Sequence, residues 1–146
     1  MPFGRYGRRL IPSHVAMPPI VVAAAVIERD GRLLITRRLA GTHLAGTWEF
    51  PGGKCEPGES LEVCLTRELL EELGVSARVG PTVMTTVHQY ADRSIELHFM
   101  TCAIDGVPQP LLNQEMRWVA RHELDALDFP PADAALIEQL KRVARG

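Results

Sequence analysis

The chain has 146 residues, of which 46% are hydrophobic and 23% are charged. This length favours one domain with a single buried core, because two ordinary domains would need a longer chain. The formal net charge of −2 excludes a broad basic face for DNA or RNA, so we expect any phosphate ligand to be held at a local site.

Residues 1–17 are rich in glycine, proline and arginine, and we interpret them as a flexible arm before a domain over residues 18–146. The apolar run from Ile20 to Ile27 is too short to span a membrane. A secretory signal is the alternative, but Pro18 and Pro19 interrupt it, and cleavage after the neighbouring alanines would cut a good strand.

The domain is expected to begin with two strands, from Ile20 to Glu28 and from Arg32 to Arg38. The Asp30-Gly31 pair between them is a strong signal for a tight hairpin turn. Later apolar patterns predict three more strands and a last helix, over residues 81–90, 94–103, 116–119 and 132–145, with Leu136, Ile137, Leu140 and Val143 on the buried side of the helix.

Between these groups of strands lies the segment GKCEPGESLEVCLTRELLEELGV, residues 53–75. Ser60 is suited to cap the free amide groups at the start of a helix, and Gly74 supplies the left-handed residue that commonly ends one. We therefore expect a helix from Ser60 to Leu73.

Three glutamates, Glu68, Glu71 and Glu72, gather on two turns of this helix. At about 100° per residue, Glu68 and Glu72 lie inside the edge of the apolar stripe and Glu71 lies beside it. A solvated acidic face is the usual interpretation, but carboxylates that lean toward the core repel one another without a counter-charge, so a site for hard divalent cations explains them better. Arg67 can hold one carboxylate in place; the alternative is a surface ion pair of little energy.

Three cysteines, Cys55, Cys64 and Cys102, show no paired metal-ligand spacing and leave an odd count for disulfides. This pattern favours reduced thiols in a cytoplasmic protein.

The acidic segment resembles the Nudix box, with the specified residues at every position: Gly53, Glu59, Arg67, Glu68, Glu71, Glu72 and Gly74. Further segments are similar to the MutT subfamily, namely ITRR at 35–38, His43, WEFPGGK at 48–54 and DFPPAD at 128–133. The resemblance implies the Nudix fold, an α/β/α sandwich with a mixed β-sheet. The helices and strands expected from the apolar pattern agree with it.

The resemblance also implies a magnesium site, manganese being the other candidate ion, built from glutamates and one backbone carbonyl: Gly52, Glu68, Glu71 and Glu72, supported by Glu59 and Arg67. Glu68 is the expected general base, with Glu71 as the alternative. Many relatives carry one more metal-binding glutamate, where LLNQEMRW stands here. Leucine occupies its place, so Glu115, three residues further on, either serves through a shifted loop or is a solvated surface residue.

Six residues are candidates for binding the nucleotide: Arg38, His43, Phe50, Lys54, Tyr90 and Asp133. Arg38 and Lys54 would contact phosphates, and Phe50 and Tyr90 the base, although such residues are more often solvated or part of the core. Asp133 stands where asparagine often reads the purine edge in the guanine-oxidation branch, whereas aspartate occurs in relatives that prefer cytosine nucleotides or accept several oxidised purines. The alternative for Asp133 is a cap on the last helix.

The implied function is hydrolysis of a nucleoside triphosphate to its monophosphate and pyrophosphate, with 8-oxo-dGTP as the first candidate, in sanitation of the nucleotide pool for DNA repair. CTP or 5-methyl-dCTP is the alternative substrate. A dinucleotide hydrolase and a nucleotide-binding protein without turnover are further alternatives, and the complete box argues against the latter. We expect a monomer or homodimer in the cytoplasm that binds neither a nucleic acid polymer nor a membrane.

Overall fold

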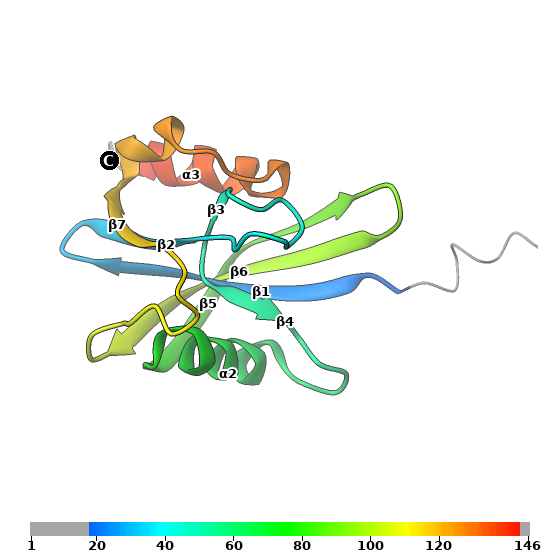
Figure 1. The fold of residues 1–146 in the computed structure, drawn as a ribbon, viewed down its shortest axis with the longest axis horizontal. Helices are drawn as coiled ribbons and strands as arrows, with labels where there is room; N and C mark the ends of the chain where they lie inside the picture. Colours follow the sequence, from blue (N-terminus) through cyan, green and yellow to red (C-terminus); the bar gives the residue numbers. More distant parts are fainter. Residues whose placement is uncertain (1–17, 144–146) are drawn as a thin grey trace, which may run out of the picture.

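The computed structural model describes residues 18–143, so the expected arm over residues 1–17 and the last residues, 144–146, lie outside it. A mixed sheet forms the middle layer, and helices cover both of its faces (Figure 1). Helix α2, Leu61–Leu73, lies on one face, and helix α3, Ala134–Val143, lies on the other. The expected α/β/α sandwich is therefore confirmed.

The sheet has seven strands, whose central order is β3-β2-β1-β6-β5, with β4 paired to β1 and β7 paired to β2. The strands are β1 Ile20–Arg29, β2 Arg32–Arg37, β3 Trp48–Glu49, β4 Gly52–Lys54, β5 Ser76–Gln89, β6 Ser94–Asp105 and β7 Met116–Ala120. Strand β1 runs antiparallel to β2 and β4 but parallel to β6, where Ala23 pairs with His98. Two short 3₁₀ helices, Arg121–Ala126 and Pro131–Asp133, precede α3.

Strand β1 is buried on both faces, and its alternate side chains belong to two separate cores. Ala23, Ala25 and Ile27 pack with the leucines of α2, which include Leu65 and Leu69. The intervening residues of β1 pack with the α3 side of the sheet, which includes Phe99 and Leu136. Because β1 packs on both sides and pairs with β4, it fixes the position of β4 beside α2.

The hairpin and the two helices follow the local signals in the sequence. Asp30 and Gly31 adopt positive φ angles of 53° and 77° in the turn between β1 and β2. The hydroxyl group of Ser60 accepts a hydrogen bond from the amide of Val63, and Gly74 ends α2 with a φ of 68°. The helix predicted from Ser60 to Leu73 is thus confirmed, with Ser60 as its cap.

Three details of the predicted elements are corrected. Strand β5 starts at Ser76 rather than at Pro81, because β-bulges on either side of Thr82 accommodate the proline. The short strands β3 and β4 were not predicted. Helix α3 begins at Ala134, after a 3₁₀ turn, and buries Leu136, Ile137 and Leu140 as expected; the side chain of Val143 lies outside the description.

The expectation of three reduced thiols is wrong for two of them. Cys55 and Cys64 form a disulfide, whereas Cys102 is free and buried. Burial raises the pKa of the Cys102 thiol to about 11, which makes this residue inert.

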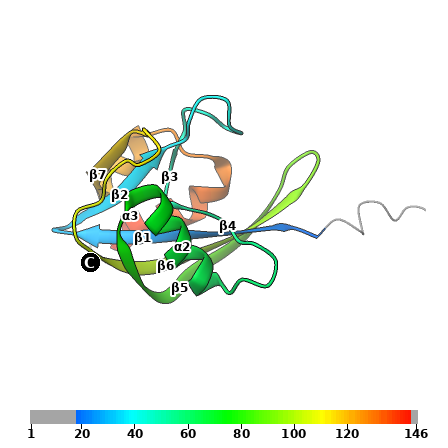
Figure 2. The same cartoon turned by 60° about the horizontal axis from the view of Figure 1, so that its bottom comes forward.

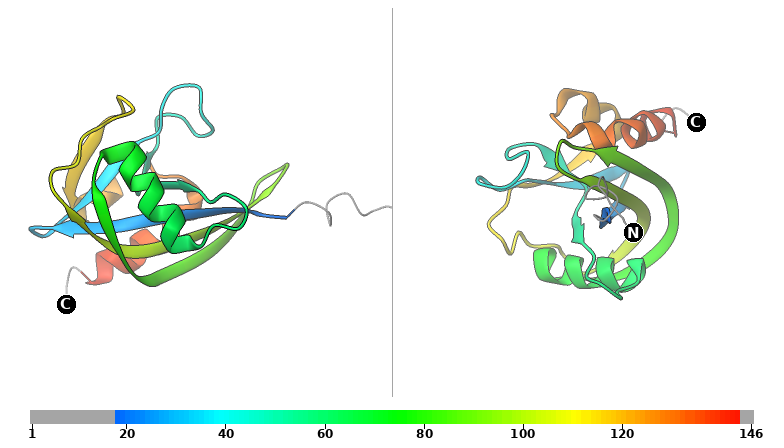
Figure 3. Two further views of the ribbon diagram at one scale, coloured as in Figure 1. Left: turned by 90° about the horizontal axis from the view of Figure 1, so that it is seen from below. Right: turned by 90° about the vertical axis from the view of Figure 1, so that its right-hand side faces the viewer.

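Strands β5 and β6 form a long hairpin, which is strongly curved in the right-hand view of Figure 3 and projects beyond the helices in Figure 2. The hairpin tip comprises residues 90–93, between the end of β5 and the start of β6. No helix in the described part of the chain is both long and apolar enough to cross a membrane.

Candidate active site

A cavity of about 500 Å³ opens between the β5–β6 hairpin, the strands near β4 and the segment before α3. This volume suits a small organic ligand. All six residues predicted to bind a nucleotide line it: Arg38, His43, Phe50, Lys54, Tyr90 and Asp133. The cavity is also lined by Gly52 and Glu72, so the acidic helix and the predicted ligand-binding residues meet in one place.

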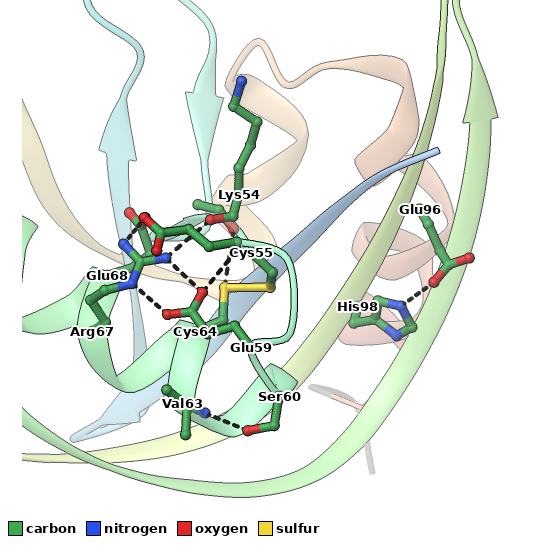
Figure 4. Close-up of a disulfide and its surroundings, with 12 residues drawn as sticks. Lys54, Cys55, Glu59, Ser60, Val63, Cys64, Arg67, Glu68, Glu96 and His98 are labelled. Carbon is green, nitrogen blue, oxygen red and sulfur yellow. Dashed lines mark hydrogen bonds and ion pairs between the residues drawn. A yellow bond between two sulfur atoms is a disulfide. The ribbon is translucent and has the colours of Figure 1, made fainter. Parts of the chain in front are cut away.

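Arg67 is the centre of the acidic cluster (Figure 4). Its guanidinium group donates to both carboxylate oxygens of Glu59, at 2.6 and 2.9 Å, and to Glu68 at 2.9 Å. A longer contact of 3.3 Å reaches Glu71, and another of 3.2 Å reaches the carbonyl oxygen of Lys54. These contacts favour the orienting role for Arg67 over that of an isolated surface ion pair.

Glu59 anchors Arg67 from the loop before the helix. Its side chain is only 11% exposed and also accepts a hydrogen bond from the amide of Glu56 at 2.9 Å. These bonds, chiefly those from Arg67, lower the pKa of Glu59 to about 2. Because Glu59 stays ionised, it holds the guanidinium group in a fixed plane next to Glu68.

Glu68 and Glu72 lean toward the sheet, whereas Glu71 is exposed, as the helical angles predicted. Glu68 lies directly above Gly53, whose missing side chain leaves room for the carboxylate. The pKa of Glu72 is raised well above its usual value, first by burial, then by a hydrogen bond with Glu68 and by the charges of Glu49 and Glu68. A hydrogen bond with the Gly52 backbone has the opposite, smaller effect on this pKa. The positive charge next to these carboxylates is therefore too small to balance their negative charges, and we call this the charge deficit.

That deficit is the feature that fits a divalent cation. The available donors are carboxylate oxygens and the backbone oxygen of Gly52, which are the ligands that magnesium and manganese prefer. Arg67 forms ion pairs with Glu68 and Glu71 but, among residues 18–143, none with Glu72. In this part of the chain no three acidic, histidine or cysteine side chains converge as a preformed metal cage. The metal-ligand set Gly52, Glu68, Glu71 and Glu72 thus remains a prediction that the donor chemistry supports.

Glu49 is a site residue that the sequence analysis missed. It lies on β3, lines the cavity, and accepts a hydrogen bond from Arg38 at 2.8 Å. Its pKa is raised by burial, with Glu68 adding to the effect and Arg38 opposing it. Arg38 in turn donates to the carbonyl oxygen of His43 at 2.6 Å. The sequence did contain a signal for this residue. Glu49 is a charged residue between Trp48 and Phe50, two aromatic residues that are both buried in the core.

Asp133 is 5% exposed and lines the same cavity. Burial and the charge of Glu49 raise its pKa to about 7, although Arg38 opposes them. Within residues 18–143, the side chain of Asp133 makes no capping hydrogen bond, and the adjacent 3₁₀ helix has none at its start. The geometry therefore favours a ligand-binding role over the cap.

Aromatic side chains form the walls and the rim. Phe50 is buried and stacks on Phe129, with 5.5 Å between the ring centroids. It therefore belongs both to the core and to the cavity wall. At the rim, the ring of Tyr90 contacts His43 edge-on at 4.9 Å and His88 at 4.6 Å. The hairpin tip thereby touches the loop after β2. Lys54 is exposed beside the opening.

Glu115 lies apart from the acidic helix, in an exposed ion pair with Arg37 at 2.8 Å. A small cleft next to Glu72 is lined instead by Leu112 and Gln114. The amide group of Gln114 donates to the Glu72 backbone carbonyl at 3.2 Å. This geometry favours the surface role for Glu115.

Comparisons with known proteins agree with the fold. The NUDIX domain profile matches residues 22–139. CTP pyrophosphohydrolase of Escherichia coli is 43% identical over 125 residues, which cover 84% of this chain and 91% of that protein. The 8-oxo-dGTP diphosphatase of Escherichia coli is 36% identical over 129 residues, which cover 87% of this chain and 100% of that protein.

Among solved structures, that of the Escherichia coli ORF135 protein superposes with a TM-score of 0.78 at 40% identity. The match covers 90% of this chain and 96% of that one.

Proposed function

This chain belongs to the NUDIX domain family of hydrolases, and we propose that it hydrolyses nucleoside triphosphates to a monophosphate and pyrophosphate with magnesium. The first candidate substrate is 8-oxo-dGTP. One observation carries the proposal: a single cavity is lined both by the acidic helix residue Glu72 and by the buried carboxyl group of Asp133. A nucleoside triphosphate has the matching parts, a polyanionic chain and a base with hydrogen-bonding edges.

The acidic helix supplies the reactive end of the site. Glu68, Glu71, Glu72 and the Gly52 carbonyl would hold the cation, which supplies positive charge to the phosphate oxygens and acidifies a water molecule. A carboxylate oxygen of Glu68 accepts the proton of the attacking water. Arg67 keeps Glu68 in place through its bond of 2.9 Å. Lys54 and Arg38, which also line the cavity, provide positive charge for the phosphates.

The base is held by Asp133 and the apolar walls. A protonated carboxyl group offers one donor and one acceptor side by side. In 8-oxoguanine, the O6 acceptor lies beside an N7–H donor, whereas in guanine O6 and N7 are both acceptors. A neutral Asp133 therefore fits the oxidised base and leaves a mismatched pair with guanine, which costs about 1–3 kcal/mol. The pKa of Asp133, raised to about 7, supports the presence of this neutral form.

Cytosine nucleotides are the second candidate, because an ionised Asp133 accepts a hydrogen bond from the N4 amino group of cytosine. The similarity to CTP pyrophosphohydrolase of Escherichia coli supports this alternative.

The test is pyrophosphate release, measured with magnesium and then with EDTA, from 8-oxo-dGTP, dGTP, CTP and 5-methyl-dCTP. Metal-dependent release that is fastest from 8-oxo-dGTP supports the first candidate, and preference for the cytosine nucleotides selects the second. Silence across the panel contradicts pyrophosphohydrolase activity and favours a dinucleotide substrate or a binding role. The Glu68→Gln variant serves as the blank for contaminating phosphatases.

A further inference from the structure

The disulfide between Cys55 and Cys64 joins the two elements that build the acidic cluster (Figure 4). Cys55 directly follows β4, and Cys64 lies in the first turn of α2. Their Cα atoms are 5.2 Å apart, within the usual range for a disulfide. The bond therefore fixes the spacing between strand and helix at the level of the site.

The loop closed by this bond contains the anchor of Arg67. Glu59 lies within it and receives two hydrogen bonds from the guanidinium group. Arg67 also donates to the carbonyl oxygen of Lys54, the residue before Cys55. Any change in the position of this loop is thus passed through Arg67 to Glu68.

The two cysteines differ in their exposure to solvent. Cys64 is completely buried, whereas Cys55 is partly exposed, so a reagent from solution reaches Cys55 first. The structure also provides a hydrogen-bond acceptor for the thiol of reduced Cys64. The Sγ atom of Cys64 lies 3.7 Å from the carbonyl oxygen of Gly53, which can accept the thiol proton that reduction adds.

We propose that Cys55 and Cys64 form a redox modification site that exchanges with small-molecule disulfides and thiols, and that the disulfide strengthens cation binding by the acidic helix. The second half rests on the proposed metal-dependent function. The Cys55 thiolate attacks a disulfide RSSR, which forms a mixed disulfide and releases RS⁻. The Cys64 thiolate then displaces the second RS⁻, so the protein loses two electrons and two protons and RSSR becomes two RSH.

The direction of the effect follows from the geometry. Two thiol sulfurs that are not bonded must lie further apart than two bonded ones, and Cys64 is enclosed, so on reduction the partly exposed loop at Cys55 moves. Glu59 and Arg67 then hold Glu68 less firmly. Loss of such supporting contacts weakens metal binding by about 10- to 100-fold in other sites, and we expect about tenfold here.

The test uses the full chain, poised with glutathione and glutathione disulfide over a range of ratios. Alkylation of the denatured protein followed by mass measurement counts the free thiols, and we expect one in the oxidised form and three in the reduced form. For the metal-free protein, reduction should lower Tm by about 5–10 °C. Binding of Mn²⁺ alone, followed by its paramagnetic resonance signal, should weaken about tenfold on reduction.

Cys55→Ser and Cys64→Ala should bind Mn²⁺ as the reduced protein does, whatever the glutathione ratio. The matched control is Cys102→Ala, which removes the free buried cysteine and should retain the full redox response. The wild-type comparison needs no variant, so a variant that fails to fold does not decide the result.

A thiol count that stays the same across the glutathione range overturns the proposal, and so does equal Mn²⁺ affinity in both redox states. Failure of the proposed function has a different signature. If no nucleotide releases pyrophosphate in either state while Tm and Mn²⁺ affinity respond to the redox ratio, the catalytic proposal falls and the redox site stands.

Discussion

The carboxylate of Glu68 occupies the space into which a side chain on Gly53 would project. Strand β4 and helix α2 therefore meet at a point where only glycine leaves room for the Glu68 carboxylate, the proposed general base. Gly53→Ala should displace Glu68 and lower kcat/KM by roughly 100-fold, since a shift of about 1 Å at a reacting group has effects of this size. Steady-state kinetics and circular dichroism would check this.

The control for this substitution is Gly58→Asn, in the loop that leads to α2. Gly58 has a φ of 81° with open space around it, and asparagine tolerates this conformation. Near wild-type kinetics are expected. An equal loss in the two variants would mean that loop strain, rather than contact with Glu68, explains the result.

Glu68→Gln should abolish turnover while leaving the fold intact. The amide has the size of the carboxylate but cannot accept the proton of water, which removes a contribution of about 10²- to 10⁴-fold in kcat. Single-turnover kinetics together with Tm would separate chemistry from folding. Retention of most of the activity would remove Glu68 as the base and direct attention to Glu71→Gln.

Arg67→Lys keeps the positive charge but loses the planar fork that binds both oxygens of Glu59. Lysine cannot reproduce this geometry while also reaching Glu68. We expect kcat to fall by about 10- to 100-fold and more magnesium to be needed for half-maximal rate. Arg78→Lys is the matched control, because Arg78 makes a paired contact with Asp105 at an exposed position, at 2.7 Å to each oxygen. Similar losses in both variants would contradict the orienting role of Arg67.

Asp133→Asn should change substrate preference. The amide always offers one donor and one acceptor, so activity on 8-oxo-dGTP should persist above pH 7, where the wild-type carboxyl group ionises. Activity on cytosine nucleotides should decline, because the ionised acceptor is lost. Ratios of kcat/KM across pH would be measured. Lower stability with unchanged preference would instead restore the capping role.

The same substitution should change how stability depends on pH. The pKa of Asp133 is about 7 in the folded protein, against an ordinary value of 3.8. Between these values the folded state holds a proton that the unfolded state has lost, so stability falls as pH rises. For the metal-free protein, ionisation of Asp133 should lower the free energy of unfolding by about 3 kcal/mol between pH 5 and pH 8. Urea unfolding at both pH values measures this change in the free energy of unfolding. If the carboxyl group were in fact solvated, the change would be the same for wild type and Asp133→Asn.

The local parts of the fold were predictable because single residues mark them. Ser60 and Gly74 bound helix α2, and Asp30 with Gly31 marks the first hairpin. Strands β3 and β4, of two and three residues, are too short for any periodic pattern to appear. The start of β5 was missed because Pro81 suggests a strand end, and only the partner strand stabilises the bulges around it.

The six residues that the sequence predicts to bind a nucleotide line one cavity in the structure, but the contacts between them could not be predicted from the sequence. Glu49 acquires its role from Arg38, eleven residues earlier, which depends on how the intervening loop folds back. An odd number of cysteines does not reveal that Cys55 and Cys64 are neighbours in space. Their pairing depends on the distance between β4 and α2, which only the sheet determines.

The parallel pairing of β1 with β6 has a consequence for biosynthesis. Ile20 pairs with Ile95, so during synthesis β1 can pair with β6 only after 75 further residues have been added (95 − 20). The cavity needs residues as late as Asp133. A nascent chain that already contains the whole acidic helix thus has neither a completed sheet nor a closed binding site. Contacts of such long range slow folding, and the protein should gain its activity late, in one step, rather than gradually as the chain emerges from the ribosome.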